Sequence, residues 1–148
     1  MKTHPYLRAY LAGIFVPTLV LPLILTVFFV IRFVLKVPVP IERAIIFPMA
    51  VVPTVFGLWN MFYLGSHERT HLPIGMHGAL IPLLGAPLMA FGGSCLGLLA
   101  FGSGGITYLQ SILVPYGLIV PLFLCGLAGY YLVWKYVVSF LNQVLGVA

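Results

Sequence analysis

The sequence is short of charge. Only 6% of its 148 residues are charged and 62% are hydrophobic, whereas soluble domains are about 25% charged. So little polar material could not cover the surface of a soluble fold. The composition therefore indicates an integral membrane protein.

Acidic residues are the scarcest. The chain has two, Glu42 and Glu68, and no aspartate. Both lie near the ends of apolar runs, and no Asp, Glu or Lys lies near the middle of one. Ion-coupled transporters and proton pumps usually need such intramembrane groups, and glycosidases need a carboxylate pair. The sequence therefore disfavours coupled transport and excludes catalysis by paired carboxylates or by a Ser-His-Asp triad.

Cysteines are also few, and Cys95 and Cys125 lie inside different apolar runs, where we expect them to pack as small apolar residues. Lys and Arg number seven, but they are scattered at the edges of the apolar runs. Scattered cations suit contact with lipid head groups. They exclude nucleic acid as a partner, because its recognition needs clustered charge.

Four apolar runs are long enough to cross a bilayer, which takes about 20 residues. They cover residues 10–35, 41–64, 74–101 and 108–134, and the last helix can continue to about residue 145. The runs are continuous, unlike the short alternating segments of a membrane β-barrel. We therefore predict an all-α membrane protein, a single domain over residues 1–148 with four transmembrane helices. The first run is too long for a signal peptide and is predicted to be retained.

Short connections make consecutive helices antiparallel and place both termini on one side of the membrane. That side carries Lys2, Arg8, Arg69 and Lys135, and the other carries Arg32, Lys36 and Arg43. The small excess predicts cytoplasmic termini. Aromatic and basic residues at the ends of the runs are predicted to anchor the protein at an interface: Trp59, Tyr63, Trp134 and Lys135.

Proline is plentiful, and it occurs as a pair in every predicted span. The pairs are Pro17/Pro22, Pro48/Pro53, Pro82/Pro87 and Pro115/Pro121. "GIFVPTLVLPL" from Gly13 and "GALIPLLGAPL" from Gly78 share the pattern G-x3-P-x4-P-L. We therefore predict an internal repeat of two helical hairpins, 10–64 and 74–134. The alternative is convergence, since proline is common in membrane helices.

A proline inside a helix removes a hydrogen bond and disturbs the carbonyl four residues earlier. In lipid, that carbonyl needs another partner. The eight prolines are therefore predicted to kink the helices and to line a cavity, although shaping helices for packing is the plainer interpretation. Gly93 and Gly97 form a G-x-x-x-G motif, which predicts close helix packing within the chain or between copies.

The densest polar stretch, "HERTHLPIGMH", contains H-E-x-x-H and a further histidine. On one helical face, His67 and His71 could bind zinc, with His77 as a third ligand and Glu68 activating a water molecule. However, Gly65 and Ser66 predict the end of a helix, and Pro73 ends any helix near His71. The stretch is therefore also predicted as a loop that contacts head groups. Haem ligation through His77 is a third alternative, and it lacks an evident partner at the same depth.

Three functions remain open. The first is a non-catalytic helix-bundle subunit or lipid-contacting scaffold that needs no cofactor and assembles as a homo-oligomer or in a larger membrane complex. The second is an uncoupled small-molecule transporter or channel, with the proline kinks around its path. The third is a metal-dependent membrane enzyme that uses the histidine stretch with zinc or haem.

Overall fold

A computed structural model describes residues 4–38, 47–108 and 112–147. Over these residues the protein has four helical segments that are long and apolar enough to cross a membrane. They are α1 (Pro5–Phe33), α2 (Phe47–Thr70), α3 (Ile74–Cys95) and a continuous run of α4 (Tyr116–Leu132), η2 (Val133–Val138) and α5 (Ser139–Val144). This confirms the predicted all-α, multi-pass membrane fold.

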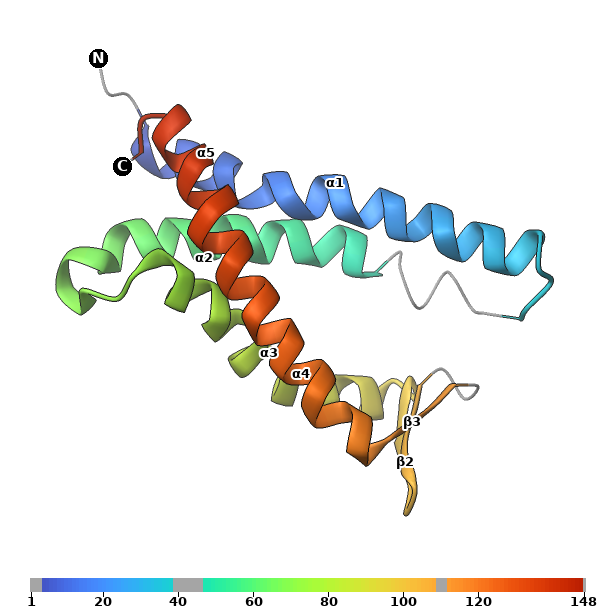
Figure 1. The fold of residues 1–148 in the computed structure, drawn as a ribbon. Coiled ribbons are helices and arrows are strands. Elements are labelled where there is room, and N and C mark those ends of the chain that lie inside the picture. The colour runs from blue at the N-terminus through green and yellow to red at the C-terminus, as the bar shows by residue number, and fades with distance from the viewer. Residues whose placement is uncertain (1–3, 39–46, 109–111, 148) are drawn as a thin grey trace.

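The helices form two antiparallel hairpins (Figure 1). One consists of α1 and α2, and the other of α3 and α4 with η2. The hairpins meet near the two chain termini, where α5 also contacts α1. From there they diverge, so that the far ends of the two hairpins lie apart (Figure 1). We call the two parts the packed end and the splayed end.

The packed end holds the core. Its buried apolar residues come from three segments: Ala9 and Ala12 from α1, Phe56 from α2, and Trp134 and Val138 from η2. The α1 and α2 backbones approach closely here, because a Cβ on Gly13 would lie 2.5 Å from the Phe56 carbonyl oxygen. In the other hairpin Gly78 makes room for a side chain, because a Cβ there would meet Trp134. These two glycines occupy matching places in the predicted repeat.

A π-helical turn interrupts the last helix. In η2 the chain carries Trp134 and Val138 on the buried side, and Asn142 of α5 is buried beyond them. A π-helix has more than 3.6 residues per turn, so it keeps residues spaced by four on nearly the same face. This turn therefore sets which side of α5 faces the core.

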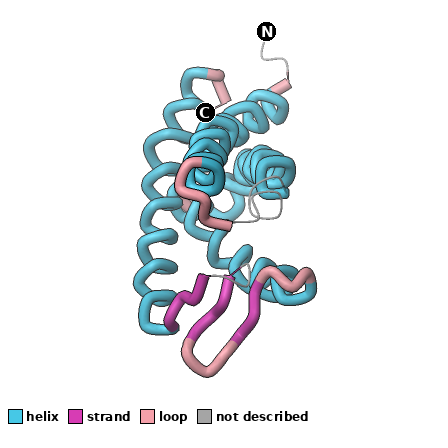
Figure 2. Tube along the Cα trace, turned by 90° about the vertical axis from the view of Figure 1, so that its right-hand side faces the viewer, coloured by secondary structure: helices cyan, strands magenta, loops and turns pink. Residues whose placement is uncertain are grey.

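At the splayed end, a three-stranded antiparallel sheet joins α3 to α4 (Figure 2). Its strands are β1 (Leu99–Phe101), β2 (Gly105–Tyr108) and β3 (Ile112–Pro115), in that order. Ala100 pairs with Thr107, and Ile106 pairs with Val114. The predictions of helix at 96–101, at 108 and at 112–115 were therefore wrong. The β-branched residues and the glycines between the strands favour a meander over helix.

Two further helix ends differ from the prediction. The third span ends at Cys95, where Gly97 takes a left-handed φ of 67°. The N–H of Leu98 then bonds to the Gly93 carbonyl and that of Gly97 to the Ser94 carbonyl, which is a Schellman cap. The second span does not end near Gly65 but continues to Thr70. Its predicted start, residues 41–46, lies outside the described residues.

Candidate functional site: an apolar cavity between the hairpins

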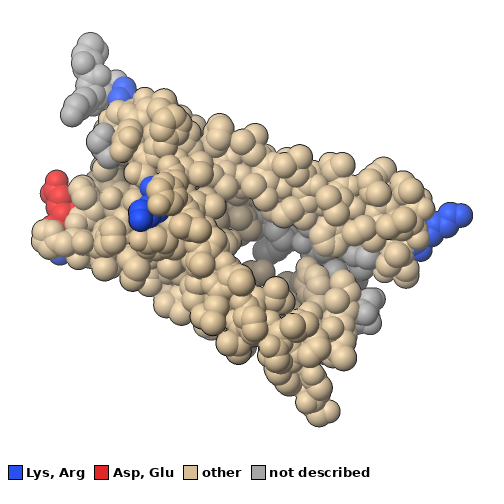
Figure 3. Space-filling model, viewed as in Figure 1, with Lys and Arg blue, Asp and Glu red and all other residues tan. Residues whose placement is uncertain are grey.

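A cavity of about 470 Å³ lies between the two hairpins. Its wall comes from five side chains of α1 between Val16 and Ile24, from Val52 and Phe56 of α2, and from the α4–η2 segment between Gly126 and Val133. It is partly open, and Figure 3 shows the hollow between the two arms. Residues from both hairpins therefore share one apolar space near the middle of their helices.

Two glycines explain why this space is not filled. Gly126 and Gly129 lie on the α4 side of the cavity, and a Cβ at either position would have no atom within 4 Å. On the opposite wall, Pro17 is buried but short. Larger residues at these positions would occupy the cavity, so the sequence leaves it open through small side chains.

The cavity is closed toward the packed end by aromatic side chains. The ring centroids of Phe56 and Tyr130 lie 5.6 Å apart, and those of Phe56 and Trp134 lie 6.2 Å apart. Trp134 and Val138 are fully buried beneath them. A long molecule in the cavity therefore cannot extend toward the chain termini without displacing the core.

The wall offers almost no polar chemistry. Among the described residues that form it, none is charged, and the Tyr130 hydroxyl is its one polar side-chain group. A space with so few hydrogen-bonding partners does not hold water well. The cavity is therefore suited to an apolar ligand.

Beyond the aromatic layer lies a small buried polar cluster that the sequence did not predict. The Nδ2 of Asn60 donates to the Ala9 carbonyl oxygen at 2.7 Å and to Oδ1 of Asn142 at 2.8 Å. Asn142 Nδ2 donates back to Asn60 Oδ1 at 3.2 Å. These hydrogen bonds join α1, α2 and α5. The signal in the sequence that could have predicted this cluster is the presence of two amide side chains inside long apolar runs.

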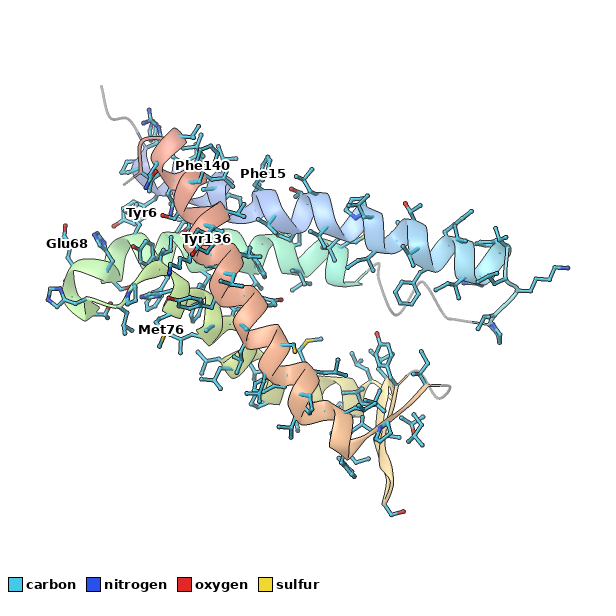
Figure 4. All side chains as sticks on the ribbon, viewed as in Figure 1. Tyr6, Phe15, Glu68, Met76, Tyr136 and Phe140 are labelled. Carbon is cyan, nitrogen blue, oxygen red and sulfur yellow. The ribbon has the colours of Figure 1, made fainter. Side chains whose placement is uncertain are left out.

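The predicted histidine site is only partly brought together. His67 lies in the last turn of α2, where its Nδ1 is 3.1 Å from the Leu64 carbonyl oxygen. His71 follows the helix with a left-handed φ of 52°, so the two histidines do not share a regular helical face. Figure 4 shows Glu68 at the tip of the bundle, pointing away from the helices.

His77 lies apart from this turn, buried in α3. Tyr63 stands between it and His67, with ring centroids 5.0 Å and 5.5 Å from the two imidazoles. Within the described ranges, its ring nitrogens have no hydrogen-bond partner, and no three His, Cys, Asp or Glu side chains are grouped so as to hold a metal ion. A zinc or haem site stays a prediction, which elemental and spectral analysis of purified protein would test.

The other predicted residues fall into different environments. Pro17 is the one proline in the described cavity wall. Pro22, Pro53, Pro82, Pro87 and Pro121 lie inside helices, and the side chain of Pro48 lies outside the described residues. Pro115 is not in a helix, because it ends β3 and precedes α4.

Two packing assignments also change. Gly97 lies beyond the end of α3, so it cannot share a helical packing face with Gly93, which instead faces Leu99. Trp134 is fully buried and is therefore not an interface anchor. Trp59 donates its indole N–H to the His77 carbonyl oxygen at 2.9 Å. Lys135 is exposed, with its ammonium 5.6 Å and 5.3 Å from the Tyr131 and Tyr136 ring centroids.

The fold and the cavity define a multi-pass integral membrane protein with an apolar cavity among its spanning helices. Comparison with models of protein families, with curated proteins and with solved structures finds no match to the chain. The site itself is therefore the basis for a function.

Proposed function

We propose that the protein is a non-catalytic, lipid-contacting membrane scaffold that binds the hydrocarbon chain of a membrane lipid between its two hairpins. The observation that carries this proposal is the cavity of about 470 Å³. Its volume falls within the range of about 300–1,000 Å³ that ligand sites occupy.

The physical chemistry of the bilayer supports a lipid chain as the occupant. An empty apolar cavity leaves the atoms of its wall without dispersion partners. Water is not stabilised in the cavity, because the Tyr130 hydroxyl is the one polar side-chain group that the described wall residues offer for a hydrogen bond. Acyl chains surround the spanning helices at high concentration, and the cavity is partly open.

The same wall bears on the alternative of an uncoupled transporter or channel. A pathway for a polar solute needs hydrogen-bonding or charged groups along it. The described wall residues are aliphatic, aromatic, glycine or proline. This composition favours a bound hydrocarbon chain over the passage of a polar molecule.

The test is to fill the cavity from the glycine side. In the double variant Gly126→Leu/Gly129→Leu, the new side chains enter the cavity. Neither causes a clash where it leaves the backbone, because no atom lies within 4 Å of a Cβ at either position. We expect native mass spectrometry of protein purified in mild detergent to show bound lipid on the unaltered chain and at least a tenfold loss on the variant.

The matched control is Gly117→Leu. Gly117 is also on α4 with no atom within 4 Å of a Cβ, and it is not part of the cavity wall. This variant should keep its lipid. Equal lipid on all three proteins would contradict the proposal, as would a cavity filled by another protein chain in the purified complex.

A further inference from the structure

We infer that the lipid in the cavity belongs to the quinone class, and that one of its carbonyl oxygens accepts a hydrogen bond from the Tyr130 hydroxyl. This inference rests on the lipid-binding function proposed above and names the chemical class of the ligand. It follows from an unpaired hydroxyl in the cavity wall, from the depth of the cavity in the bilayer, and from the aromatic rings at its closed side.

The Tyr130 hydroxyl is a hydrogen-bond donor without a partner in the described part of the chain. Tyr130 lies in the cavity wall, and no hydrogen bond of its hydroxyl occurs within the described ranges. The fully buried side-chain atoms that lack a partner there belong to His77 and Trp134. The Tyr130 oxygen is therefore accessible to a ligand. Because a hydroxyl in an apolar environment costs free energy until it is hydrogen-bonded, a ligand that supplies an acceptor gains affinity.

A ligand with acceptors alone fits this wall best. One phenol supplies one donor hydrogen, and the other described wall residues are aliphatic, aromatic, glycine or proline. A ligand with its own O–H or N–H would donate to the Tyr130 oxygen and leave the phenol hydrogen unpaired, which costs free energy. A carbonyl ligand avoids this cost, because it accepts the phenol hydrogen and brings no donor of its own.

The depth of the cavity excludes a charged head group as the source of the acceptor. The α1 part of the wall runs from Val16 to Ile24. Val16 lies about 17 Å from Pro5, and Ile24 lies about 14 Å from Phe33, at about 1.5 Å per residue. Half of the hydrocarbon core is about 15 Å thick. The cavity therefore lies near the middle of the bilayer, where a phosphate would lose its hydration. The acceptor has to belong to an uncharged group.

A flat ring fits the closed side of the cavity. Phe56 and Tyr130 line it with two aromatic rings that are tilted by 54° to each other. Aromatic rings pack with a further ring in tilted or offset arrangements, and such contacts add to the gain from apolar burial. The α1 wall from Val16 to Ile24 is about 12 Å long, which leaves room beyond the ring for part of an apolar chain. A quinone combines an uncharged ring, carbonyl acceptors and a hydrocarbon chain.

The experiment compares two probes with the same chain, decylbenzoquinone and decylbenzene, of which the first carries carbonyl groups on its ring. Equal amounts are added to the protein in mild detergent. Bound molecules are counted by native mass spectrometry, and each count is corrected for the partition of the probe into detergent. We expect the unaltered chain to prefer decylbenzoquinone. Tyr130→Phe should reduce decylbenzoquinone binding about fivefold, as expected for one hydrogen bond, and leave decylbenzene binding unchanged.

Tyr131→Phe is the matched control. Tyr131 is the next residue of α4, its ring lies against Gly75 and near the Lys135 ammonium, and it is not part of the described cavity wall. This variant should bind both probes as the unaltered chain does.

Equal binding of the two probes by the unaltered chain would overturn the inference without the use of any variant. Unchanged decylbenzoquinone binding in Tyr130→Phe would also overturn it, as would an equal loss of both probes there or an equal loss of decylbenzoquinone in Tyr131→Phe. The proposed function fails separately, if Gly126→Leu/Gly129→Leu binds both probes as tightly as the unaltered chain.

Discussion

The packed end and the splayed end of this protein are both built from apolar helices, yet within the described ranges the buried hydrophobic side chains all lie at the packed end. At the packed end, glycines let the helices touch, and buried amides bond across them. Large aliphatic and aromatic side chains remain exposed at both ends, as Tyr6 and Phe140 do at the packed end and Phe29 does at the splayed end. Lipid is as apolar as these side chains, so burying them against another helix gains little. Close backbone approach and hydrogen bonds therefore decide where the helices meet.

The largest effect should come from separating α1 and α2 at the packed end. Gly13→Leu places a Cβ 2.5 Å from the Phe56 carbonyl oxygen, and backbone cannot yield as a side chain can. We expect a loss of about 3 kcal/mol or more in stability, at the upper end of overpacking costs. Thermal unfolding followed by tryptophan fluorescence should report it directly, because Trp59 and Trp134 both contact the packed end.

Gly85→Leu serves as the control, since a Cβ there has no atom within 4 Å. It should unfold within a few degrees of the unaltered protein. If Gly13→Leu were as stable as Gly85→Leu, close approach of α1 and α2 would not be what holds the packed end together.

The next effect concerns the amide pair. Asn60→Leu removes donors to both Ala9 and Asn142, whereas Asn142→Leu removes one partner. We expect losses of about 1.5 and about 1 kcal/mol, in line with hydrogen bonds inside membrane proteins. The double variant should lose less than the sum, because no unpaired amide remains. Strictly additive losses in a denaturant titration would show that the two amides do not interact.

A smaller effect is expected at the splayed end. Gly97→Ala puts a Cβ on a residue with a φ of 67°, which costs about 1 kcal/mol. Hydrogen exchange should rise in residues 96–108 while tryptophan fluorescence at the packed end stays the same. Gly104→Ala has open space and no positive φ, so it should leave exchange unchanged. Loss of structure at both ends would show that the two parts are not independent.

The smallest effect depends on pH. Burial raises the pKa of Tyr108, in the sheet outside the spanning helices, above its ordinary value of 10.0. The folded sheet therefore holds this proton more tightly than the unfolded chain does. The stability that the folded state gains from this proton is complete below pH 10 and is lost as the pH rises above that value. The measurement is a pH titration of tyrosinate absorbance for the unaltered chain and for Tyr108→Phe. The difference between the two curves belongs to Tyr108 and should have its midpoint above the ordinary pKa of 10.0. A midpoint at or below pH 10 would contradict this prediction.

Apolar length and helix breakers were sufficient to predict the spans and their antiparallel order, because crossing a bilayer sets a minimum length. They could not locate the sheet, since Leu99–Phe101 and Ile112–Pro115 are as apolar as the helices beside them. They also placed the end of α2 too early. Gly65 and Ser66 usually weaken a helix, but here Thr70 and Ser66 hydroxyls bond back to preceding carbonyls and the helix continues.

The sequence predicted eight prolines around a cavity, and the wall of the cavity in the described structure includes one of them. Pro17 lines this cavity, but the empty space depends equally on Gly126 and Gly129. No motif around these two glycines in the sequence indicated a role for them. Their importance arises only when α4 is set across α1 and α2. The predicted internal repeat stays a prediction.

The π-helical turn at Val133–Val138 has a consequence for how this sequence can change by insertion and deletion. A π-helix turns less per residue than the 100° of an α-helix, so the same six residues wound as regular α-helix would carry everything after them roughly 100° further around the axis. Asn142 would then leave Asn60 and face lipid, although no residue of the amide pair had been altered. The length of this turn and its winding are therefore coupled: a chain with all six residues has to keep the wider turn, and a related chain that lacks one of them keeps the two amides facing each other by winding the turn as regular helix.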